Sequence, residues 1–462
     1  MMVKRIFISI TLLFFSVMGF SVSLEDLTGM MLESNMDIKA ARAVYEKEVL
    51  SAKFFNGEYS PKVSLSSSAT IPDEYSFKDL PDYFSSSVVY SQPFPGGTSV
   101  SLEAGIGFNS EKVEDSVLLK QQPNVLLRLT QSLMPFWIQG KIKDPVTLTA
   151  KQKKEYYYNQ LLYTKKNVWI SLLQYYVYAL TSRSEIEINK NTIGLYEAQI
   201  ESIIELKKQG KASQSDVLEL ENSKWSTEQN LISAQSNYLT NIQNIKNICG
   251  QNFDDCLLEM SKDSNEIDGI IEKLIGSAKD PLEQSYKIKL EILKSSRVIE
   301  KQSTAPMLSV SIQPGLVLNT TLKDDWKDTW KNMDSPSNWT VGIGIDLSNM
   351  FSGMTNQNKE KYQIDYNEAK ESYNLYLQQR RFVQQQYEAL LQQYIQQKEI
   401  VDSLYESGLQ ELKDYELQFE RGEISKIDFE SAYVRVENCR LKREEIILYI
   451  SLYESLVKIN SY

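Results

Sequence analysis

The sequence predicts an α+β membrane protein of long antiparallel helical hairpins, with short strands that contribute to a transmembrane β-barrel shared between copies of the chain. Glycine and proline are scarce, at 19 and 12 residues in 462, whereas typical usage is about 7% and 5%. Apolar residues recur at helical spacing over very long stretches, and elsewhere they alternate with polar ones as in strands. The same order of helices and strands occurs twice, which predicts an internal duplication.

The composition excludes several classes of protein. The chain has no histidine, which rules out Ser-His-Asp and Cys-His catalysis and histidine-ligated metals. Its net charge of -11 disfavours a nucleic-acid partner, and 24% charged residues exclude a membrane protein made of many apolar helices. We therefore predict no enzymatic activity, no catalytic residue, no cofactor and no metal site.

Residues 1–23 are typical of a secretory signal peptide. Lys4 and Arg5 precede an apolar stretch over residues 6–20, and Ser21-Val22-Ser23 offers a small-x-small cleavage site. The stretch is about 15 residues, which is short for a bilayer span of about 20. An uncleaved anchor helix is the alternative.

After the signal, the pattern predicts a helix over residues 24–60. Alternation with a period of two over 98–108 and 125–134 then predicts strands with one apolar and one polar face. Helical spacing returns over 145–209, which corresponds to about 96 Å of helix. It continues after a glycine break over 213–249.

The second half of the chain repeats this order. We predict a helix over residues 281–305 and strands over 308–313 and 339–347. A long helix of about 99 Å then covers 356–421, and a last helix follows a second glycine break over 426–460.

The two glycine breaks share the motif Gly-x-x-Ser-x-x-Asp before an apolar residue, which predicts a turn at each repeat break. Its positions are Gly210, Ser213 and Asp216 in the first half, and Gly422, Ser425 and Asp428 in the second. The duplication predicts a first repeat over 24–250, a connecting segment over 251–280 and a second repeat over 281–460. Two unrelated coiled-coil hairpins are the alternative.

These helices and strands need partners. A helix of about 100 Å cannot bury its apolar stripe in one compact domain, so it must pack on other long helices, as in a coiled coil or a helical barrel. A secreted strand with an apolar face and a small or polar one suits a membrane β-barrel; a soluble sheet with one buried face is the alternative. Barrels begin at about eight strands, so several chains must combine.

The chain resembles the TolC-type outer-membrane efflux protein family over nearly all of residues 24–460. The segment LTGMMLESNMDIKA resembles the family's opening helix, with Asn35 near its usual Asn-Pro and Met36 in place of the proline. The other similar segments are LRLTQSL, which leads into the first long helix, its counterpart GIGIDLSNMFSG, and the two breaks at 208–219 and 421–430.

This resemblance implies a homotrimer in the cell outer membrane that extends into the periplasm. Twelve strands would form one barrel in outer-membrane lipid, and the helices would form a trimeric α-barrel below it. The implied function is a passive exit duct of a tripartite efflux or type I secretion system, working with a periplasmic adaptor (membrane fusion) protein and an inner-membrane pump. The alternative is a non-conducting coiled-coil envelope scaffold or adhesin.

Two features depart from the family pattern. Residues 62–134 contain more strand-like sequence than the family's two strands. The tyrosine and arginine that latch the tunnel entrance in the family match Phe419 and Ile424, so that latch is not implied here.

The resemblance also indicates a ring of carboxylates at the periplasmic entrance. Asp216 and Asp428 match its acidic positions, whereas its second carboxylate falls on Ser431, next to Glu430. Each aspartate also follows a serine by three residues, which is a capping-box pattern. The candidates for the ring are therefore Asp216, Asp428 and Glu430, with helix capping as the alternative role.

Cysteines and aromatic residues supply the remaining candidates. Cys249 and Cys256 flank a glycine, and an oxidising compartment would permit a disulfide between them; the third cysteine is expected to be a buried apolar residue. Phe108 and Trp339 at strand ends suit an aromatic girdle, and Trp137 is a candidate for the other membrane interface. Ordinary core aromatics are the alternative.

Overall fold

The computed structural model describes most of the chain as two compact units. We call Met1–Val44, Tyr158–Gln284 and Asn374–Tyr462 the helical unit, and Tyr45–Tyr157 with Ser285–Tyr373 the sheet unit. Nearly all of the predicted signal peptide, Trp137 and Cys256 lie outside the described residues. The described residues are 23–55, 60–70, 83–94, 98–113, 116–133, 145–250, 269–270, 280–315, 318–321, 338–347 and 354–461.

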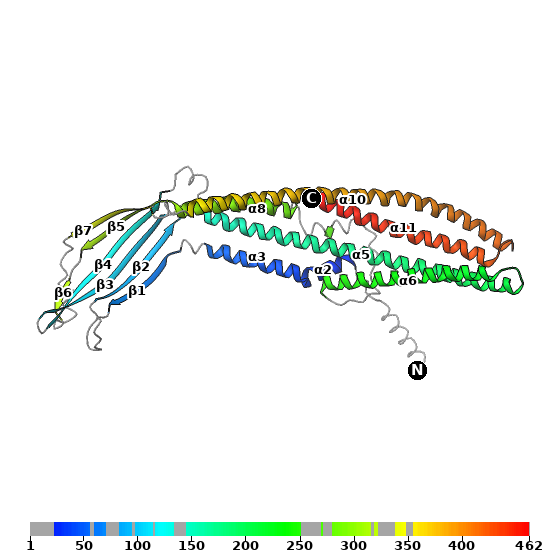
Figure 1. The fold of residues 1–462 in the computed structure, drawn as a ribbon, viewed down its shortest axis with the longest axis horizontal. Coiled ribbons are helices and arrows are strands. Elements are labelled where there is room, and N and C mark those ends of the chain that lie inside the picture. The colour runs from blue at the N-terminus through cyan, green and yellow to red at the C-terminus, as the bar shows by residue number, and fades with distance from the viewer. Residues whose placement is uncertain are drawn as a thin grey trace, which may run out of the picture. The chain divides into compact units, whose positions relative to one another are not determined.

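Long helices dominate the described chain, as the sequence predicts (Figure 1). Two of them have 64 and 67 residues, and each is followed by a short turn and a helix of 36 residues. The helices are α2 (Leu24–Ser34), α3 (Met36–Phe55), α5 (Pro145–Lys208), α6 (Gln214–Cys249), α8 (Pro281–Thr304), α10 (Met354–Glu420) and α11 (Lys426–Ser461).

The prediction of one helix over residues 24–60 is wrong, because Asn35 divides it into α2 and α3. The Asn35 Oδ1 accepts hydrogen bonds from the Asp37 and Ile38 amides at 3.0 and 3.1 Å. This caps α3 as an asparagine commonly does. Its Nδ2 donates to the Ile248 carbonyl at 3.0 Å, near the end of α6. The apolar spacing runs on across the break and therefore conceals it.

The core of the helical unit gathers side chains from distant parts of the sequence. Leu24, Leu27 and Met31 of α2 are fully buried, and so is Trp169 of α5. The Trp169 Nε1 donates to the Thr28 Oγ1 at 3.2 Å, so the largest core side chain has its polar atom satisfied. Burying each large apolar side chain contributes about 1.5–3 kcal/mol.

The sheet unit contains a single antiparallel sheet of seven strands among the described residues. The order is β1-β2-β3-β4-β5-β7, and β6 pairs with β4 beyond the part that pairs with β5. The strands are β1 (Lys62–Thr70), β2 (Tyr83–Phe94), β3 (Thr98–Val113), β4 (Ser116–Ser132), β5 (Met307–Gly315), β6 (Leu318–Thr321) and β7 (Asn338–Asp346). Four strands precede α5, which confirms the excess of strand sequence and doubles the two that the resemblance implies.

Candidate functional site

One face of the sheet is apolar and exposed. The strand register places Tyr90 opposite Leu102, Leu102 opposite Leu127, and Leu127 opposite Ile312, so the same face continues from strand to strand. We call it the apolar face, and its exposed members include Val63, Leu65, Val88, Tyr90, Phe94, Leu102, Val125, Leu127, Leu129, Ile312, Trp339, Val341, Ile343 and Ile345. Such a large uncovered apolar surface marks a contact with lipid or with another protein.

The opposite face, which we call the polar face, carries mainly serine, glycine and threonine. Its serines pair across strands, with Oγ–Oγ distances of 2.9 Å for Ser66 and Ser87 and 2.7 Å for Ser68 and Ser85. A Cβ at Gly105 would lie 2.8 Å from the Ser87 Cβ, so glycine is needed where these strands approach closely. Most of this face therefore consists of short side chains.

The three aromatic candidates differ in what the structure shows. Trp339 lies near the start of β7 on the apolar face, with 64% of its surface exposed. Phe108 lies in β3, where the register sets it opposite Phe84 and Gln121. Trp137 is outside the described residues, so the second interface stays a prediction.

The two hairpin ends have the same backbone geometry. Gly210 and Gly422 have φ values of +73° and +68°, a conformation that glycine adopts without strain. The Gly210 amide donates to the Lys207 carbonyl at 2.9 Å, and the Gly422 amide donates to the Phe419 carbonyl at the same distance. In each hairpin the next amide bonds a carbonyl five residues back, so both helices end in a Schellman motif.

A capping box begins the second helix of each hairpin. The Ser213 amide donates to the Asp216 Oδ2 at 2.7 Å, and the Asp216 amide donates to the Ser213 Oγ at 3.2 Å. Ser425 and Asp428 form the same pair of bonds, each at 3.2 Å. The Ser213 amide holds the pKa of Asp216 below its ordinary value, because it donates to the charged carboxylate. The capping role of both aspartates is therefore visible in the structure.

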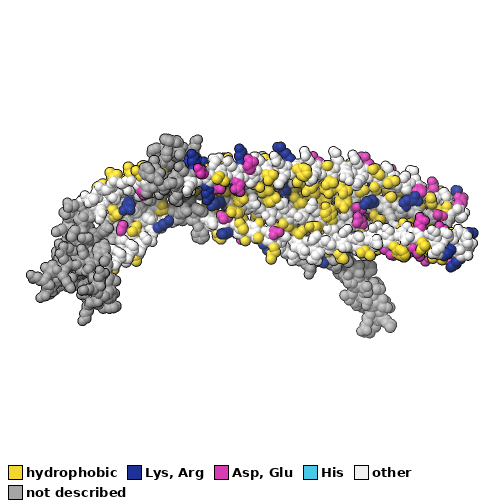
Figure 2. Space-filling model, in the orientation of Figure 1, with side chains coloured by type: hydrophobic (Ala, Val, Ile, Leu, Met, Phe, Trp, Pro, Cys, Tyr) yellow, Lys and Arg dark blue, Asp and Glu magenta, His cyan; other side chains and the backbone are white. Residues whose placement is uncertain are grey.

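The other entrance candidates also bond within their own hairpin. The Glu430 Oε1 forms an ion pair with the Lys426 Nζ at 3.0 Å, and Phe419 stacks on Phe429 with ring centroids 5.3 Å apart. Figure 2 shows acidic and basic side chains mixed where the hairpins end. The bonds described for Asp216 and Asp428 also stay within their own hairpins, so a shared acidic ring remains a proposal.

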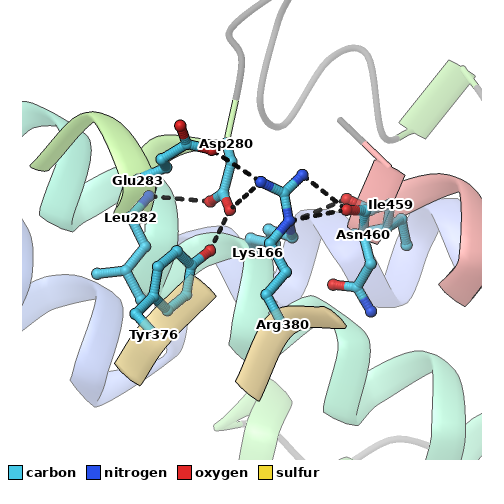
Figure 3. Close-up of polar contacts among 8 residues, drawn as sticks. All are labelled: Lys166, Asp280, Leu282, Glu283, Tyr376, Arg380, Ile459 and Asn460. Carbon is cyan, nitrogen blue, oxygen red and sulfur yellow. Dashed lines mark hydrogen bonds and ion pairs between the residues drawn. The ribbon is translucent and has the colours of Figure 1, made fainter. Parts of the chain in front are cut away.

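A buried ionic cluster in the helical unit joins residues from four helices or their ends (Figure 3). Asp280, with only 2% of its side chain exposed, caps α8 by accepting from the Leu282 amide at 3.1 Å. The Arg380 Nη1 of α10 lies 3.2 Å from the Asp280 Oδ2 and 2.9 Å from the Glu283 Oε2. The Tyr376 hydroxyl also donates to Asp280.

The same cluster holds the end of α11. The Arg380 Nε and Nη2 donate to the Asn460 carbonyl at 3.1 and 2.8 Å, and the Lys166 Nζ donates to the Ile459 carbonyl at 3.0 Å. Cations are favourable at a helix C-terminus, where carbonyls lack helical partners. Burial lowers the pKa of Lys166 and raises that of Tyr376, because both charged forms lose hydration.

Sequence reasoning missed this cluster. The Asp280-Pro281 pair is a recognisable helix start, and it was the only signal available. Lys166 lies 114 residues before Asp280 and Arg380 lies 100 residues after it, so no local pattern relates them. The contacts of these residues join four helices to one another, so we interpret the cluster as a structural joint.

Cys249 has no disulfide partner among the described residues and is buried at the end of α6. Its Sγ donates to the Leu27 carbonyl at 3.6 Å, and burial raises the pKa of the thiol to about 12. Its predicted partner Cys256 lies outside the described residues, and the disulfide stays a prediction.

Comparisons with known proteins identify the fold. No family profile matches the chain, and no curated protein matches it. Among solved structures, the outer-membrane channel OprN is 13% identical with a TM-score of 0.58, over 94% of this chain and 89% of that one. The CmeC outer membrane channel of Campylobacter jejuni is 12% identical with a TM-score of 0.58, over 95% and 85%.

The MtrE outer membrane channel of Neisseria gonorrhoeae, in its open state, is also similar. It is 9% identical with a TM-score of 0.59, over 95% of this chain and 89% of that one. The chain therefore has the fold of outer-membrane channels, and the predicted resemblance to TolC-type proteins is confirmed at the level of fold. In the described residues, no helix has the length and apolar character needed to cross a membrane.

Proposed function

We propose that this protein is a passive outer-membrane exit duct that carries drugs or proteins from an inner-membrane pump to the outside. The observation that carries the proposal is the apolar face of the sheet, exposed across its whole width in a chain with the fold of outer-membrane channels. Lipid would cover this face, while the serine-rich polar face would line a water-filled interior. No group of the duct performs chemistry, and the pump supplies the energy.

The proposed assembly has three copies in the outer membrane and extends into the periplasm. Six strands side by side cannot close a barrel alone, because membrane barrels begin at about eight. A periplasmic adaptor would join the helical hairpins to the pump, in a tripartite efflux or type I secretion system. The proposed chain organisation is a signal peptide over 1–23, repeats over 24–250 and 281–460, and a connecting segment over 251–280.

A non-conducting scaffold or adhesin is the competing function, and the apolar face argues against it. In a water-exposed scaffold, side chains such as Leu65 and Ile343, each 73% exposed, would remain in contact with water. Soluble monomers rarely leave apolar patches of more than a few hundred Å² uncovered. Lipid gives this surface an occupant without any change in the sheet.

Conductance in planar lipid bilayers tests the proposal, with two residues on opposite faces of β7 as a matched pair. Arginine at Ile343, on the apolar face, is expected to reduce insertion, since the cost near the bilayer midplane is about 2–4 kcal/mol. Arginine at Thr340, on the polar face, is expected to leave insertion intact. An inactive wild-type protein, or equal tolerance of I343R and T340R, would contradict the duct.

The entrance ring is a further part of this proposal. In a trimer, Asp216, Asp428 and Glu430 would supply nine carboxylates from three copies, and their combined field would favour cations. The variant D216N/D428N keeps size and much of the capping ability, because asparagine is also a good capping residue. We expect the trimer to persist while its preference for cations falls.

Asp26 provides the control for the entrance ring. It occupies the same position in a capping box, accepting from the Ser23 amide at 3.1 Å, but it lies at the start of α2 rather than at a hairpin end. The variant D26N should leave ion selectivity unchanged. If D216N/D428N also left it unchanged in an intact trimer, both aspartates would be helix caps only.

A further inference from the structure

Among the strands that the structure describes, β1 and β7 each have one edge without a strand partner, and the two edges match each other. β1 and β7 stand at opposite ends of the strand order, and each is nine residues long. Every neighbouring pair from β1 to β7 is antiparallel. Five antiparallel steps separate the two edges, so β7 runs opposite to β1. The β7 edge of one copy can therefore form an antiparallel ladder with the β1 edge of another.

The faces of the two edge strands also match. Leu65 of β1 and Ile343 of β7 both lie on the apolar face, whereas Ser66 and Thr340 lie on the polar face. Pairing the edges would continue both faces without interruption. The exposure of the edge residues is consistent with a strand missing at each edge. Leu65 and Ile343 are each 73% exposed, whereas Leu127 of the central strand β4 is 43% exposed.

The sheet of each copy is wider than the resemblance implies. Six strands lie side by side, counting the two edge strands. β6 adds no further position, because it pairs with β4 on the same side as β5, farther along that strand. A barrel of twelve strands from three copies requires four positions per copy. The additional pair lies within residues 62–132, where the structure has four strands instead of two.

We propose that β7 of each copy pairs with β1 of the next, and that three copies close a barrel of eighteen strands rather than twelve. The proposal rests on the proposed function for the number of copies. With strands ~4.8 Å apart and tilted by ~40°, the barrel is ~36 Å across between opposite strands, whereas twelve strands give ~24 Å. This head-to-tail pairing leaves no open edge, which otherwise invites aggregation.

A wide barrel with a serine-rich lining changes what limits the cargo. Barrels of 16–18 strands enclose an aqueous channel, whereas small ones are filled by their own side chains. Short side chains such as Ser66, Ser68 and Ser87 leave most of that interior open. The barrel therefore does not set the upper size of the cargo, and the helical part must do so.

Electron cryo-microscopy of the trimer in detergent or nanodiscs tests the strand count, and native mass spectrometry gives the number of copies. Three copies with a ring ~36 Å across support the proposal. Three copies with a ring ~24 Å across would overturn it and leave the exit duct standing. A preparation that forms no three-copy ring and does not conduct in planar bilayers would overturn both.

Disulfide trapping tests the pairing of β7 with β1 independently. In a background without the native cysteines, Leu65→Cys is combined in turn with cysteine at Val341, Ile343 or Ile345. These positions sample every second residue of β7, because each register that keeps the two apolar faces together differs from the next by two residues. We expect oxidation to give covalent dimers and trimers with one of these partners. The control combines Leu65→Cys with Thr340→Cys, which lie on opposite faces. Equal cross-linking in the control, or none with any apolar-face partner, would refute the pairing.

Discussion

Replacement of Arg380 by methionine is the most direct test of the buried ionic cluster. Methionine retains most of the volume but removes every hydrogen bond and ion pair that the guanidinium makes with Asp280, Glu283 and the Asn460 carbonyl. Asp280 is only 2% exposed, so R380M would leave this buried carboxylate without its close cation. Removing one partner of a buried ion pair costs about 3–5 kcal/mol.

The expected shift in thermal unfolding follows from the length of the chain. At about 2.1 cal/mol/K per residue, the unfolding entropy of this chain is near 1 kcal/mol/K, so R380M should lower the midpoint by ~3–5 °C. Circular dichroism at 222 nm in detergent measures it, at one scan rate because large proteins often unfold irreversibly. Arg421 is the control: its side chain is 66% exposed and 4.0 Å from Glu423, and R421M should cost about 0–1 kcal/mol.

A double variant tells whether the stability lost in R380M comes from the unpaired carboxylate of Asp280. Asparagine at Asp280 preserves the cap on α8 and removes the unpaired charge. R380M/D280N should therefore be more stable than the sum of the two single variants predicts. If R380M shifted the midpoint no more than R421M, or if D280N added its full cost to that of R380M, the cluster would have no special role in stability.

Three further outcomes are expected. Alanine at Gly210, where φ is +73°, should destabilise the protein by about 1–2 kcal/mol. Alanine at Gly194, in open space on α5, should instead stabilise it by about 1 kcal/mol. Equal unfolding midpoints of the two variants by circular dichroism would contradict this. The pKa of Asp216 is lowered in the folded state, so its carboxylate stabilises the protein when the pH is above the pKa of the unfolded state. This stabilisation is lost as the pH falls through the pKa of the folded state. The difference in melting temperature between wild type and D216N should therefore shrink from pH 5 to pH 2.5. Burial raises the pKa of Cys249 to about 12. In folded protein whose cysteines have been reduced, iodoacetamide at pH 8 should therefore label the half-buried Cys439 before Cys249, as mass mapping would report. Equal labelling of these two thiols would refute the burial of Cys249.

The parts of the fold that sequence could predict are those decided locally. The long helices follow from apolar spacing, and each hairpin turn follows from a glycine, a serine and an aspartate at fixed separations. The break between α2 and α3 at Asn35 was not predicted, because an asparagine side chain can replace a turn of helix without altering the apolar spacing around it. The bounds of β1 were not predicted, because serine occupies both of its faces after Leu65 and the alternation of apolar and polar residues is lost.

The candidate site divides in the same way. The capping roles of Asp216 and Asp428 were open to prediction because both partners lie within three residues. The ionic cluster was not, since it depends on tertiary structure that brings Lys166, Asp280 and Arg380 together. The width of the sheet depends on which serine-rich segments pair, and this too is settled by neighbours distant in sequence.

The identical hairpin ends have a consequence for how such a protein can change over time. Each turn is fixed by main-chain bonds and by only three side-chain identities, as at Gly210, Ser213 and Asp216. The intervening positions, Lys211 and Ala212, carry no share of that geometry through their side chains. Substitutions there can accumulate without loss of the turn, so a lineage can alter the surface of the hairpin tips while the turn that presents it stays constant.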